Sequence, residues 1–184
     1  MGGVIEEAAS GRAKCRVCQE KIPKGELRFG EKVPNPFAEG EATYWFHLPC
    51  AADYRPEPLL EALEQTEQHI EARAELIAVA RQGIERPKLS SIGRAERAPS
   101  GRARCRQCRE LIEKEDYRLV VERIEDGMLS PGGFIHARCA VARAGPDGLV
   151  ERVRRRTKGL TEEELESVVE LIASGSAAPP NESD

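Results

Sequence analysis

Eight side chains of this sequence have the types and the spacing of metal ligands. They form two groups of four, each a Cys-x2-Cys pair followed by a His-x2-Cys pair: Cys15, Cys18, His47 and Cys50, and Cys105, Cys108, His136 and Cys139. Thiolates and imidazoles are preferred zinc donors, and four of them complete a tetrahedral shell. We therefore expect two structural Zn2+ ions, without the open coordination position that catalysis requires.

A single Cys-x2-Cys pair is also compatible with a redox dithiol or with two small buried residues. The duplicated pattern favours zinc, because it uses all six cysteines and two of the three histidines. The N-terminus lacks the basic start and apolar run of a signal peptide, and no stretch has the length of a membrane span. We expect an intracellular protein without membrane contact, cytoplasmic or nucleoid-associated in a bacterium and nuclear in a eukaryote.

The elements that must position these ligands are repeated along the chain. The segment SGRAKCRVCQEKI at 10–22 recurs as SGRARCRQCRELI at 100–112, and both His-x2-Cys pairs follow in order. Strands are predicted before and at each second ligand pair, at 27–33, 43–46, 117–123 and 133–136. Helices are predicted at 58–82 and at 161–173, the latter opened by a capping box of Thr161 and Glu164.

The predicted fold class is α+β, with two small β-rich zinc modules that are each followed by a helical segment. Only 4% of the 184 residues are aromatic and 33% are charged, so thin cores stabilised by metal are expected. The expected boundaries are a first module at 1–56, a helix at 57–83, a linker at 84–99, a second module at 100–145, a helical segment at 146–174 and a disordered tail at 175–184.

Charge gives mixed indications about a nucleic-acid partner. The net charge of −4 disfavours one, but basic residues alternate beside each Cys-x2-Cys pair, at Arg12, Lys14 and Arg16 and at Arg102, Arg104 and Arg106. In an extended chain each trio shares one face, which is suited to tracking phosphates. A solvated charged face is the alternative interpretation.

The modules resemble the PARP-type zinc finger of poly(ADP-ribose) polymerase and of a nuclear DNA ligase. The resemblance rests on Ser-Gly-Arg-Ala-x-Cys-x-x-Cys in both halves, on Ile22-Pro23-Lys24-Gly25-x-Leu27-Arg28, and on Trp45-x-His47-x-x-Cys50. The second half departs from the pattern, since Phe134 and Ile135 stand where the tryptophan is expected and its loop is one residue shorter.

This resemblance implies recognition of DNA strand breaks by shape, through phosphate contacts and an apolar loop stacked on the exposed base pair. It assigns phosphate contacts to Arg12 and Arg102, and places Arg28 and Arg118 toward the DNA. The implied stacking residues are Phe37, Ala38 and Ala42 in the first module, and Met128 and Leu129 in the second. Phe37 lies in a loop bounded by Pro and Gly, where its ring either stacks on a base or packs under its own loop.

Two functional hypotheses follow from these features. The first is a zinc-dependent protein that binds DNA ends, nicks or breaks in DNA-damage repair, with a repair protein as a possible partner. The second is a zinc-stabilised adaptor for protein interaction or dimerisation, favoured by the net negative charge and the acidic helix at 58–82. An enzyme is not expected, because the sequence has neither a glycine-rich phosphate loop nor an open metal site. The oligomeric state and the preferred break geometry stay open.

Overall fold

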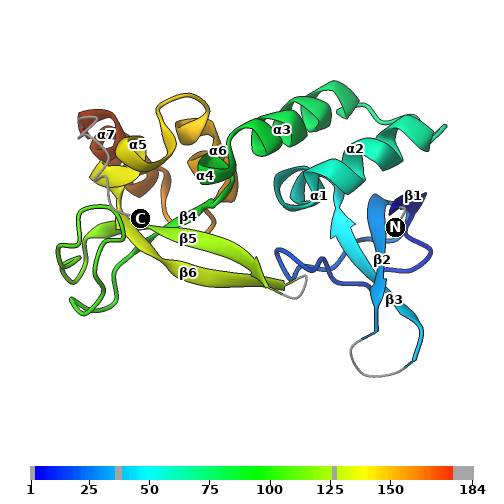
Figure 1. The fold of residues 1–184 in the computed structure, drawn as a ribbon, viewed down its shortest axis with the longest axis horizontal. Helices are drawn as coiled ribbons and strands as arrows, with labels where there is room; N and C mark the ends of the chain where they lie inside the picture. The colour runs from blue at the N-terminus through cyan, green and yellow to red at the C-terminus, as the bar shows by residue number, and fades with distance from the viewer. Residues whose placement is uncertain (1–2, 36–38, 126–127, 176–184) are drawn as a thin grey trace. The chain divides into compact units, whose positions relative to one another are not determined.

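The computed structural model describes residues 3–35, 39–125 and 128–175, and the side chains of these residues except 124–128. The chain divides between Glu85 and Arg86 into two compact units, unit 1 and unit 2, which are described separately (Figure 1). Each unit holds a three-stranded antiparallel sheet and helices, so the predicted α+β class is confirmed. Within the described residues, no helix is long and apolar enough to cross a membrane.

The sheet of unit 1 has the order β1-β2-β3. Its strands are β1 (Gly3–Glu7), β2 (Leu27–Pro34) and β3 (Glu41–His47). The strands predicted at 27–33 and 43–46 are confirmed as parts of β2 and β3. The register pairs Arg28 with His47, so the sheet places a basic side chain opposite the predicted histidine ligand.

The sheet of unit 2 repeats this arrangement with the order β4-β5-β6. Its strands are β4 (Ile92–Arg97), β5 (Tyr117–Glu125) and β6 (Met128–His136), which contain the strands predicted at 117–123 and 133–136. Arg118 pairs with His136, as Arg28 pairs with His47 in unit 1.

The expected linker at 84–99 needs correction, because the structure places a helix and a sheet strand there. Helix α4 (Pro87–Ser90) is followed at once by β4, whose Ile92 and Ala95 are buried. This strand is difficult to recognise in the sequence, because its buried positions hold mostly small residues. Glycine and charged residues lie within it, and prolines lie on both sides of it. The duplication also starts earlier than expected, because Gly3, Glu6 and Ala8 recur 90 positions later as Gly93, Glu96 and Ala98.

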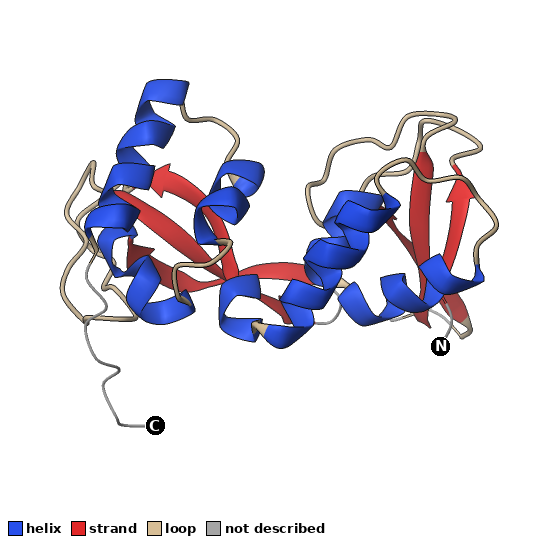
Figure 2. Ribbon diagram, turned by 90° about the horizontal axis from the view of Figure 1, so that it is seen from above, coloured by secondary structure: helices blue, strands red, loops and turns tan. Residues whose placement is uncertain are grey.

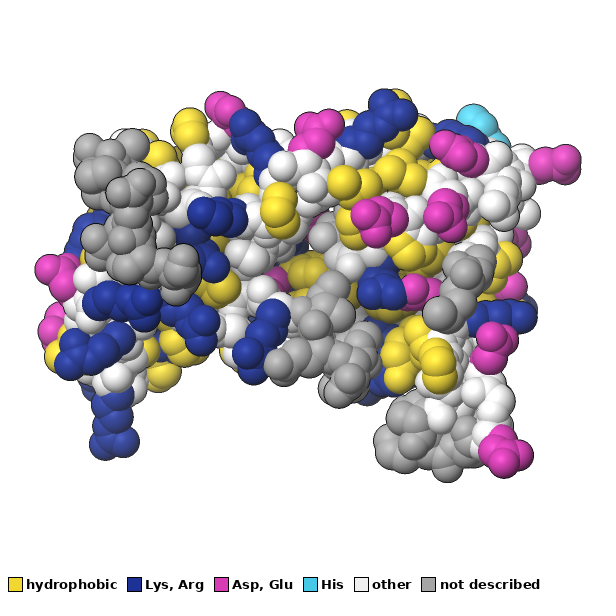
Figure 3. Space-filling view, in the orientation of Figure 1, with side chains coloured by type: hydrophobic (Ala, Val, Ile, Leu, Met, Phe, Trp, Pro, Cys, Tyr) yellow, Lys and Arg dark blue, Asp and Glu magenta, His cyan; other side chains and the backbone are white. Residues whose placement is uncertain are grey.

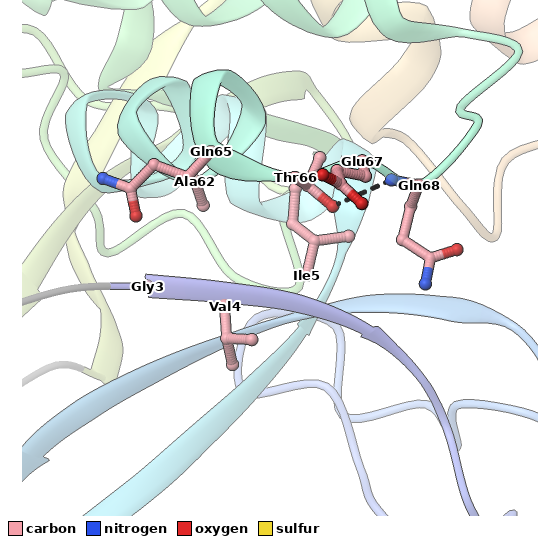
Figure 4. A pocket seen from close by; sticks show the side chains of 8 residues that line it. All are labelled: Gly3, Val4, Ile5, Ala62, Gln65, Thr66, Glu67 and Gln68. Carbon is pink, nitrogen blue, oxygen red and sulfur yellow. Dashed lines mark hydrogen bonds between the residues drawn. The ribbon is translucent and has the colours of Figure 1, made fainter.

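The single helix expected at 57–83 is two helices, so that prediction was wrong. They are α2 (Pro56–Gln65) and α3 (Arg73–Glu85), and a short helix α1 (Leu48–Tyr54) precedes them. The backbone N–H of Gln68 donates to Thr66 Oγ1 at 3.2 Å, which turns the chain out of α2 (Figure 4). The Arg73 guanidinium donates to the Leu63 carbonyl and so anchors the start of α3 to the end of α2.

Apart from α4, unit 2 carries its helices at and after the second ligand pair. These are the 3-10 turn η1 (Ala137–Cys139), α5 (Ala140–Ala144), α6 (Leu149–Arg156) and α7 (Glu162–Ser174). The predicted capping box is confirmed, since Thr161 Oγ1 accepts from the Glu164 N–H at 3.2 Å and Glu164 Oε2 accepts from the Thr161 N–H at 2.9 Å. The bond from the Thr161 N–H to the carboxylate, and next the Arg97 guanidinium, lower the pKa of Glu164. The tail expected at 175–184 lies outside the described residues apart from Gly175.

Each unit has its own apolar core between the sheet and its helices (Figure 2). In unit 1, Phe29 and Phe46 of the sheet pack with Leu59 and Leu63 of α2. In unit 2 the fully buried set includes Ile112, Leu119, Ile135, Leu149 and Ile172. Both cores are thin, and each includes one cysteine of the metal pattern, Cys15 or Cys105. A metal ion bound by these cysteines would therefore fix the loop that carries each of them to the core of its unit.

Candidate metal centres and the basic surface beside them

The two Cys-x2-Cys segments fold into the same tight turn. In unit 1 the Cys15 N–H donates to the Glu20 carbonyl at 2.8 Å, and the Gln19 N–H donates to the Cys15 carbonyl at 2.9 Å. Gln19 has a φ of 62°, a left-handed conformation that closes the turn. Unit 2 repeats each feature with Cys105 and Glu110 and with Arg109 at a φ of 67°. The turn brings both sulfur atoms of a pair to one side.

The second ligand pair comes from the end of the last strand and the turn that follows it. His47 is the last residue of β3, and Cys50 lies in the first turn of α1. His136 is the last residue of β6, and Cys139 ends η1. Strand pairing thus fixes each histidine, while the following helix fixes each cysteine.

The structure brings together the same two groups of four that the sequence predicted. Within each group the candidate ligand atoms all lie within 4.8 Å of one another. The Cys18 Sγ to His47 Nδ1 distance is 3.4 Å, as is the Cys108 Sγ to His136 Nδ1 distance. A tetrahedral zinc with ordinary bond lengths needs S···N separations of about 3.6 Å and S···S separations of about 3.8 Å. The donor sets and their spacing are therefore consistent with two zinc ions.

The histidine rings are oriented by carbonyl groups of the same turns. His47 Nε2 lies 3.4 Å from the Lys21 carbonyl oxygen, and His136 Nε2 lies 3.0 Å from that of Leu111. A proton on Nε2 that is donated to the carbonyl leaves the Nδ1 lone pair facing the thiols. Such a contact to the far ring nitrogen is the usual support of a metal-bound histidine.

Electrostatics within each cysteine group favour a cation. The hydrogen bond with Cys50, supported by the backbone N–H groups of neighbouring residues, lowers the pKa of Cys15 to about 4. Burial, and next the charges of Cys105 and Cys108, raise the pKa of Cys139 to about 12. Three adjacent thiolates repel one another in the absence of a counter-charge, and a divalent ion removes that penalty by binding all of them.

The basic residues predicted beside the first ligand pairs lie on the surface. Arg12, Lys14, Arg102, Arg104 and Arg106 are exposed, and among the described residues none of the five forms an ion pair. Figure 3 shows Lys and Arg side chains gathered over the loops between β4 and β5, the segment that contains Arg102, Arg104 and Arg106. These residues are available to an anionic ligand.

Arg16 is the half-buried exception among these predicted contacts. Its guanidinium carbon lies 4.0 Å from the centroid of the Tyr44 ring, a cation–π distance. The alternation of Arg12, Lys14 and Arg16 therefore places two cations in solvent and one against the sheet.

Arg28 and Arg118 are buried and paired inside the sheets, and the DNA contact that the resemblance implied for them stays a prediction. Arg28 is 8% exposed, donates to Glu6 Oε1 at 2.7 Å, and lies 3.5 Å from the Trp45 ring centroid. Arg118 is 6% exposed and makes the equivalent contacts with Glu96, at 2.6 Å, and with the Phe134 ring, at 3.5 Å. We refer to Arg28 with Glu6 and Trp45, and to Arg118 with Glu96 and Phe134, as the arginine stacks. Each joins the first, second and third strand of its sheet.

The expected stacking loops are only partly described. Phe37 and Ala38 lie outside the described residues, whereas Ala42 is half-buried in β3. Met128 is the first residue of β6, but its side chain lies outside what the structure describes, and Leu129 is half-buried beside it. The structure therefore does not test the predicted stacking by Phe37 or Met128.

Glu6 and Glu96 of the arginine stacks were missed in the sequence, although a comparison of the two halves upstream of Ser10 and Ser100 could have found them. A hollow of about 340 Å³ in unit 1, lined by β1 and by residues 62 and 65–68, contains no residue of the cysteine group (Figure 4).

Comparison with known proteins identifies relatives of this arrangement. Residues 6–86 match the family described as poly(ADP-ribose) polymerase and DNA-ligase Zn-finger region. The chain is 29% identical over 164 residues to poly [ADP-ribose] polymerase 1 of Gallus gallus, which covers 79% of this chain and 16% of that protein. It is 29% identical over 133 residues to poly [ADP-ribose] polymerase of Sarcophaga peregrina, covering 62% of this chain and 13% of the relative. The chain thus spans a small part of these relatives, and the residues matching the family include the first cysteine group.

Proposed function

We propose that this chain is a zinc-dependent DNA-binding protein that recognises strand breaks or ends, from the premise that residues 6–86 are a PARP-type zinc-finger region. The second Cys3His group, on an equivalent sheet, makes a tandem pair of fingers. The observation that carries the proposal is that each metal group closes a turn flanked by exposed, unneutralised cations. Fingers of this family in poly(ADP-ribose) polymerase bind DNA breaks.

The proposed role of zinc is structural. Four protein donors at each centre fill a tetrahedral shell, so no position remains for a reacting water. The ion contributes folding free energy by holding the cysteine turn to the end of the third strand and to the next helix. The residues proposed as ligands are Cys15, Cys18, His47 and Cys50 in unit 1, and Cys105, Cys108, His136 and Cys139 in unit 2. We propose no catalytic step for this chain.

The proposed DNA contacts are to phosphates. Arg12 and Lys14 in unit 1, and Arg102 and Arg104 in unit 2, lie in exposed loops without an acidic partner among the described residues. Contacts of this kind give affinity and register but carry no base sequence. Recognition of a break then depends on the shape of the duplex end and on apolar residues that stack there, for which Phe37, Met128 and Leu129 remain the candidates.

The test compares DNA molecules that differ only in their breaks. Zinc-loaded protein is titrated with closed circular, singly nicked and blunt-ended duplex in filter-binding assays at several salt concentrations. We expect clear preference for nicked or blunt-ended DNA over the closed circle. Equal affinity for all three would leave general DNA binding and remove break recognition.

The charge contribution is tested at Arg12. Arg12→Ala should weaken binding and reduce the slope of log affinity against log salt by about one, because one phosphate contact is lost. The control is Arg81→Ala, which removes the same charge from an exposed position of α3. An unchanged slope in Arg12→Ala would exclude that residue as a phosphate contact.

A second candidate function is a zinc-stabilised adaptor for protein interaction or dimerisation. It is favoured by unit 1, since residues 1–85 carry 15 Asp and Glu against 10 Lys and Arg. Exposed glutamates lie along α2 and in its connection to α3, at Glu57, Glu61, Glu64, Glu67 and Glu71. A purified protein that sediments as a dimer and binds none of the three DNA forms would support this candidate over the first. For either function we propose an intracellular location.

A further inference from the structure

In unit 2, two side chains of the α6 region bind backbone groups at the outer edge of the first strand. Arg152 of α6 is buried, and its Nε and Nη2 donate at 2.6 Å to the carbonyls of Ile92 and Ser90. Thr157, which follows the last residue of α6, accepts the Ala95 N–H of β4 at 3.0 Å through Oγ1. These bonds give partners to backbone groups that the edge of a sheet leaves unpaired.

The duplication places different residues at these positions in unit 1. The buried positions of the two helices coincide at a shift of 90 residues: Leu59, Ala62 and Leu63 in α2, and Leu149, Arg152 and Val153 in α6. Ala62 therefore stands at the position of Arg152, and at the same shift Glu67 stands at the position of Thr157. Unit 1 thus has a methyl group where unit 2 has a guanidinium, and a carboxylate where unit 2 has a hydroxyl.

The hollow of about 340 Å³ in unit 1 lies at this place (Figure 4). The residues that line it are Gly3, Val4 and Ile5 of β1, Ala62 of α2, and residues 65–68 at the end of that helix. It therefore lies between the first strand and the following helix, the two elements that Arg152 joins in unit 2.

The lining of the hollow offers acceptors for a cation. Ile5 has the same register with β2 that Ala95 has with β5, and the Ala95 N–H is turned away from β5 toward Thr157. Because alternate residues of an antiparallel strand face the same way, the backbone groups of Ile5 and Gly3 are turned away from β2. Glu67 adds a carboxylate, and no ion pair neutralises it within the described parts of the chain.

The surroundings of the hollow carry negative charge. Exposed glutamates lie along α2 at Glu57, Glu61 and Glu64, and residues 1–85 hold more acidic than basic residues. A surface of this charge attracts a cationic partner and repels the phosphates of DNA. The occupant that complements the hollow is therefore basic.

We propose that this hollow binds an arginine side chain from a basic segment of a partner protein. The bound arginine lies where Arg152 lies in unit 2, and its donors meet the outward carbonyls of Gly3 and Ile5 and the Glu67 carboxylate. The residue that matches Ile92 is Gly2, which lies outside the described residues, so no acceptor is assigned to it. A guanidinium has five donors in a planar fork, so it satisfies several acceptors at once, which the ammonium of lysine does less well.

This site goes beyond DNA recognition, because it needs no DNA and lies on an acidic part of unit 1. It gives the second candidate function, protein interaction, a location and a partner chemistry. It also makes the two units unequal, since unit 2 fills the matching position with its own arginine.

The first experiment uses the tripeptide acetyl-Gly-Arg-Gly-amide as the probe. Zinc-loaded full chain labelled with 15N is titrated with the peptide, and its backbone amide resonances are followed by NMR. We expect saturable shifts at Ile5 and at residues 65–68. The same peptide with lysine should bind several-fold more weakly, and the peptide with citrulline, which has the shape of arginine without its charge, should give no saturable shift.

Three results of this titration would overturn the site. They are equal affinity for the arginine and lysine peptides, shifts centred on Glu57 and Glu61 rather than on the hollow, and the absence of saturable shifts up to the solubility of the peptide. Each would leave only a general attraction of cations to the acidic surface, or no attraction.

Variants separate the hollow from the surrounding charge. Ala62→Arg installs the residue of unit 2, and we expect it to fill the hollow and abolish the saturable shifts while two equivalents of zinc stay bound. Glu67→Gln preserves the size of the side chain, folds whether or not Ala62→Arg does, and should lower the peptide affinity several-fold. Glu61→Gln, which changes an exposed glutamate of α2 outside the hollow, should leave the affinity unchanged. Full affinity in Glu67→Gln, or an equal loss in Glu61→Gln, would contradict the site.

A parallel titration with nicked duplex DNA separates this site from the proposed function. Wild-type protein that binds the arginine peptide but no DNA retains the site, and the proposed function fails. Wild-type protein that binds nicked DNA but gives no saturable shift with the peptide retains the proposed function, and the site is wrong.

Discussion

Arg28 and Arg118 show how one residue type is used in two ways in the same small domain. Each is buried, bonded to a glutamate of the first strand and stacked on an aromatic ring of the third strand. Each is also paired in register with the histidine of its metal group. The arginine stacks therefore hold the strand that delivers the histidine, while the exposed arginines of the cysteine turns remain free for a ligand.

The contacts of Arg28 in its stack lead to a stability prediction. Arg28→Met keeps the length of the side chain but removes its bond to Glu6 and its cation–π contact with Trp45. We expect the free energy of unfolding of the zinc-loaded protein to fall by about 1–3 kcal/mol, measured by urea denaturation. Lys24→Met, a change of an exposed cation in the same unit, should change it by less than about 0.5 kcal/mol. A variant that lost DNA affinity at full stability would instead support the direct DNA contact implied by the resemblance.

The metal ligands could be predicted from the sequence because cysteine and histidine in this spacing have few other uses. The environment of Arg28 and Arg118 could not, because whether an arginine is exposed or buried depends on a glutamate that another strand supplies. A sequence pattern identifies the cysteine and histidine ligands of a metal. It does not identify which side chains pair with an arginine or another common charged residue.

At the scale of secondary structure, the strands were predicted where apolar and aromatic residues are numerous and missed where they are few. β2, β3, β5 and β6 belong to the first class, whereas β1 (GVIEE) and β4 (IGRAER) combine two apolar residues each with glycine and charged residues. The break between α2 and α3 was missed because residues 59–82 contain neither proline nor glycine. Thr66 ends α2 through a side-chain hydrogen bond, a local signal that helical periodicity does not register.

Helix α7 offers a prediction at this scale. Thr161→Ala removes one bond of the capping box, and we expect a loss of about 1 kcal/mol in the stability of α7, read from faster amide hydrogen exchange along the helix. Ser167→Ala is the control, because that hydroxyl donates to the Glu163 carbonyl within the helix and caps nothing. Equal effects of the two variants would contradict the importance of the cap.

For the whole molecule, the separate cores determine how the chain responds to loss of one metal. The buried residues fall into two sets, one within residues 5–80 and one within residues 89–172, and each set surrounds its own cysteine group. Neither set alone is large, so each unit should depend on its own ion. The units should then fail independently.

His136→Ala tests that independence. We expect the zinc content to fall from two equivalents to one, the amide resonances of unit 2 to collapse, and those of unit 1 to keep their positions. His47→Ala should give the reverse pattern. Cooperative loss of both units in either variant would show that the two fingers stabilise each other.

The arginine stack of unit 1 has a practical consequence, because Trp45 is the only tryptophan of the chain. Its ring lies against the Arg28 guanidinium, two residues before a candidate ligand, and unit 2 has Phe134 in the corresponding stack. Indole fluorescence therefore reports on unit 1 and gives no signal from unit 2. Metal exchange or ligand engagement at one finger can thus be timed in the intact, unlabelled protein, with tyrosine emission as the channel common to both.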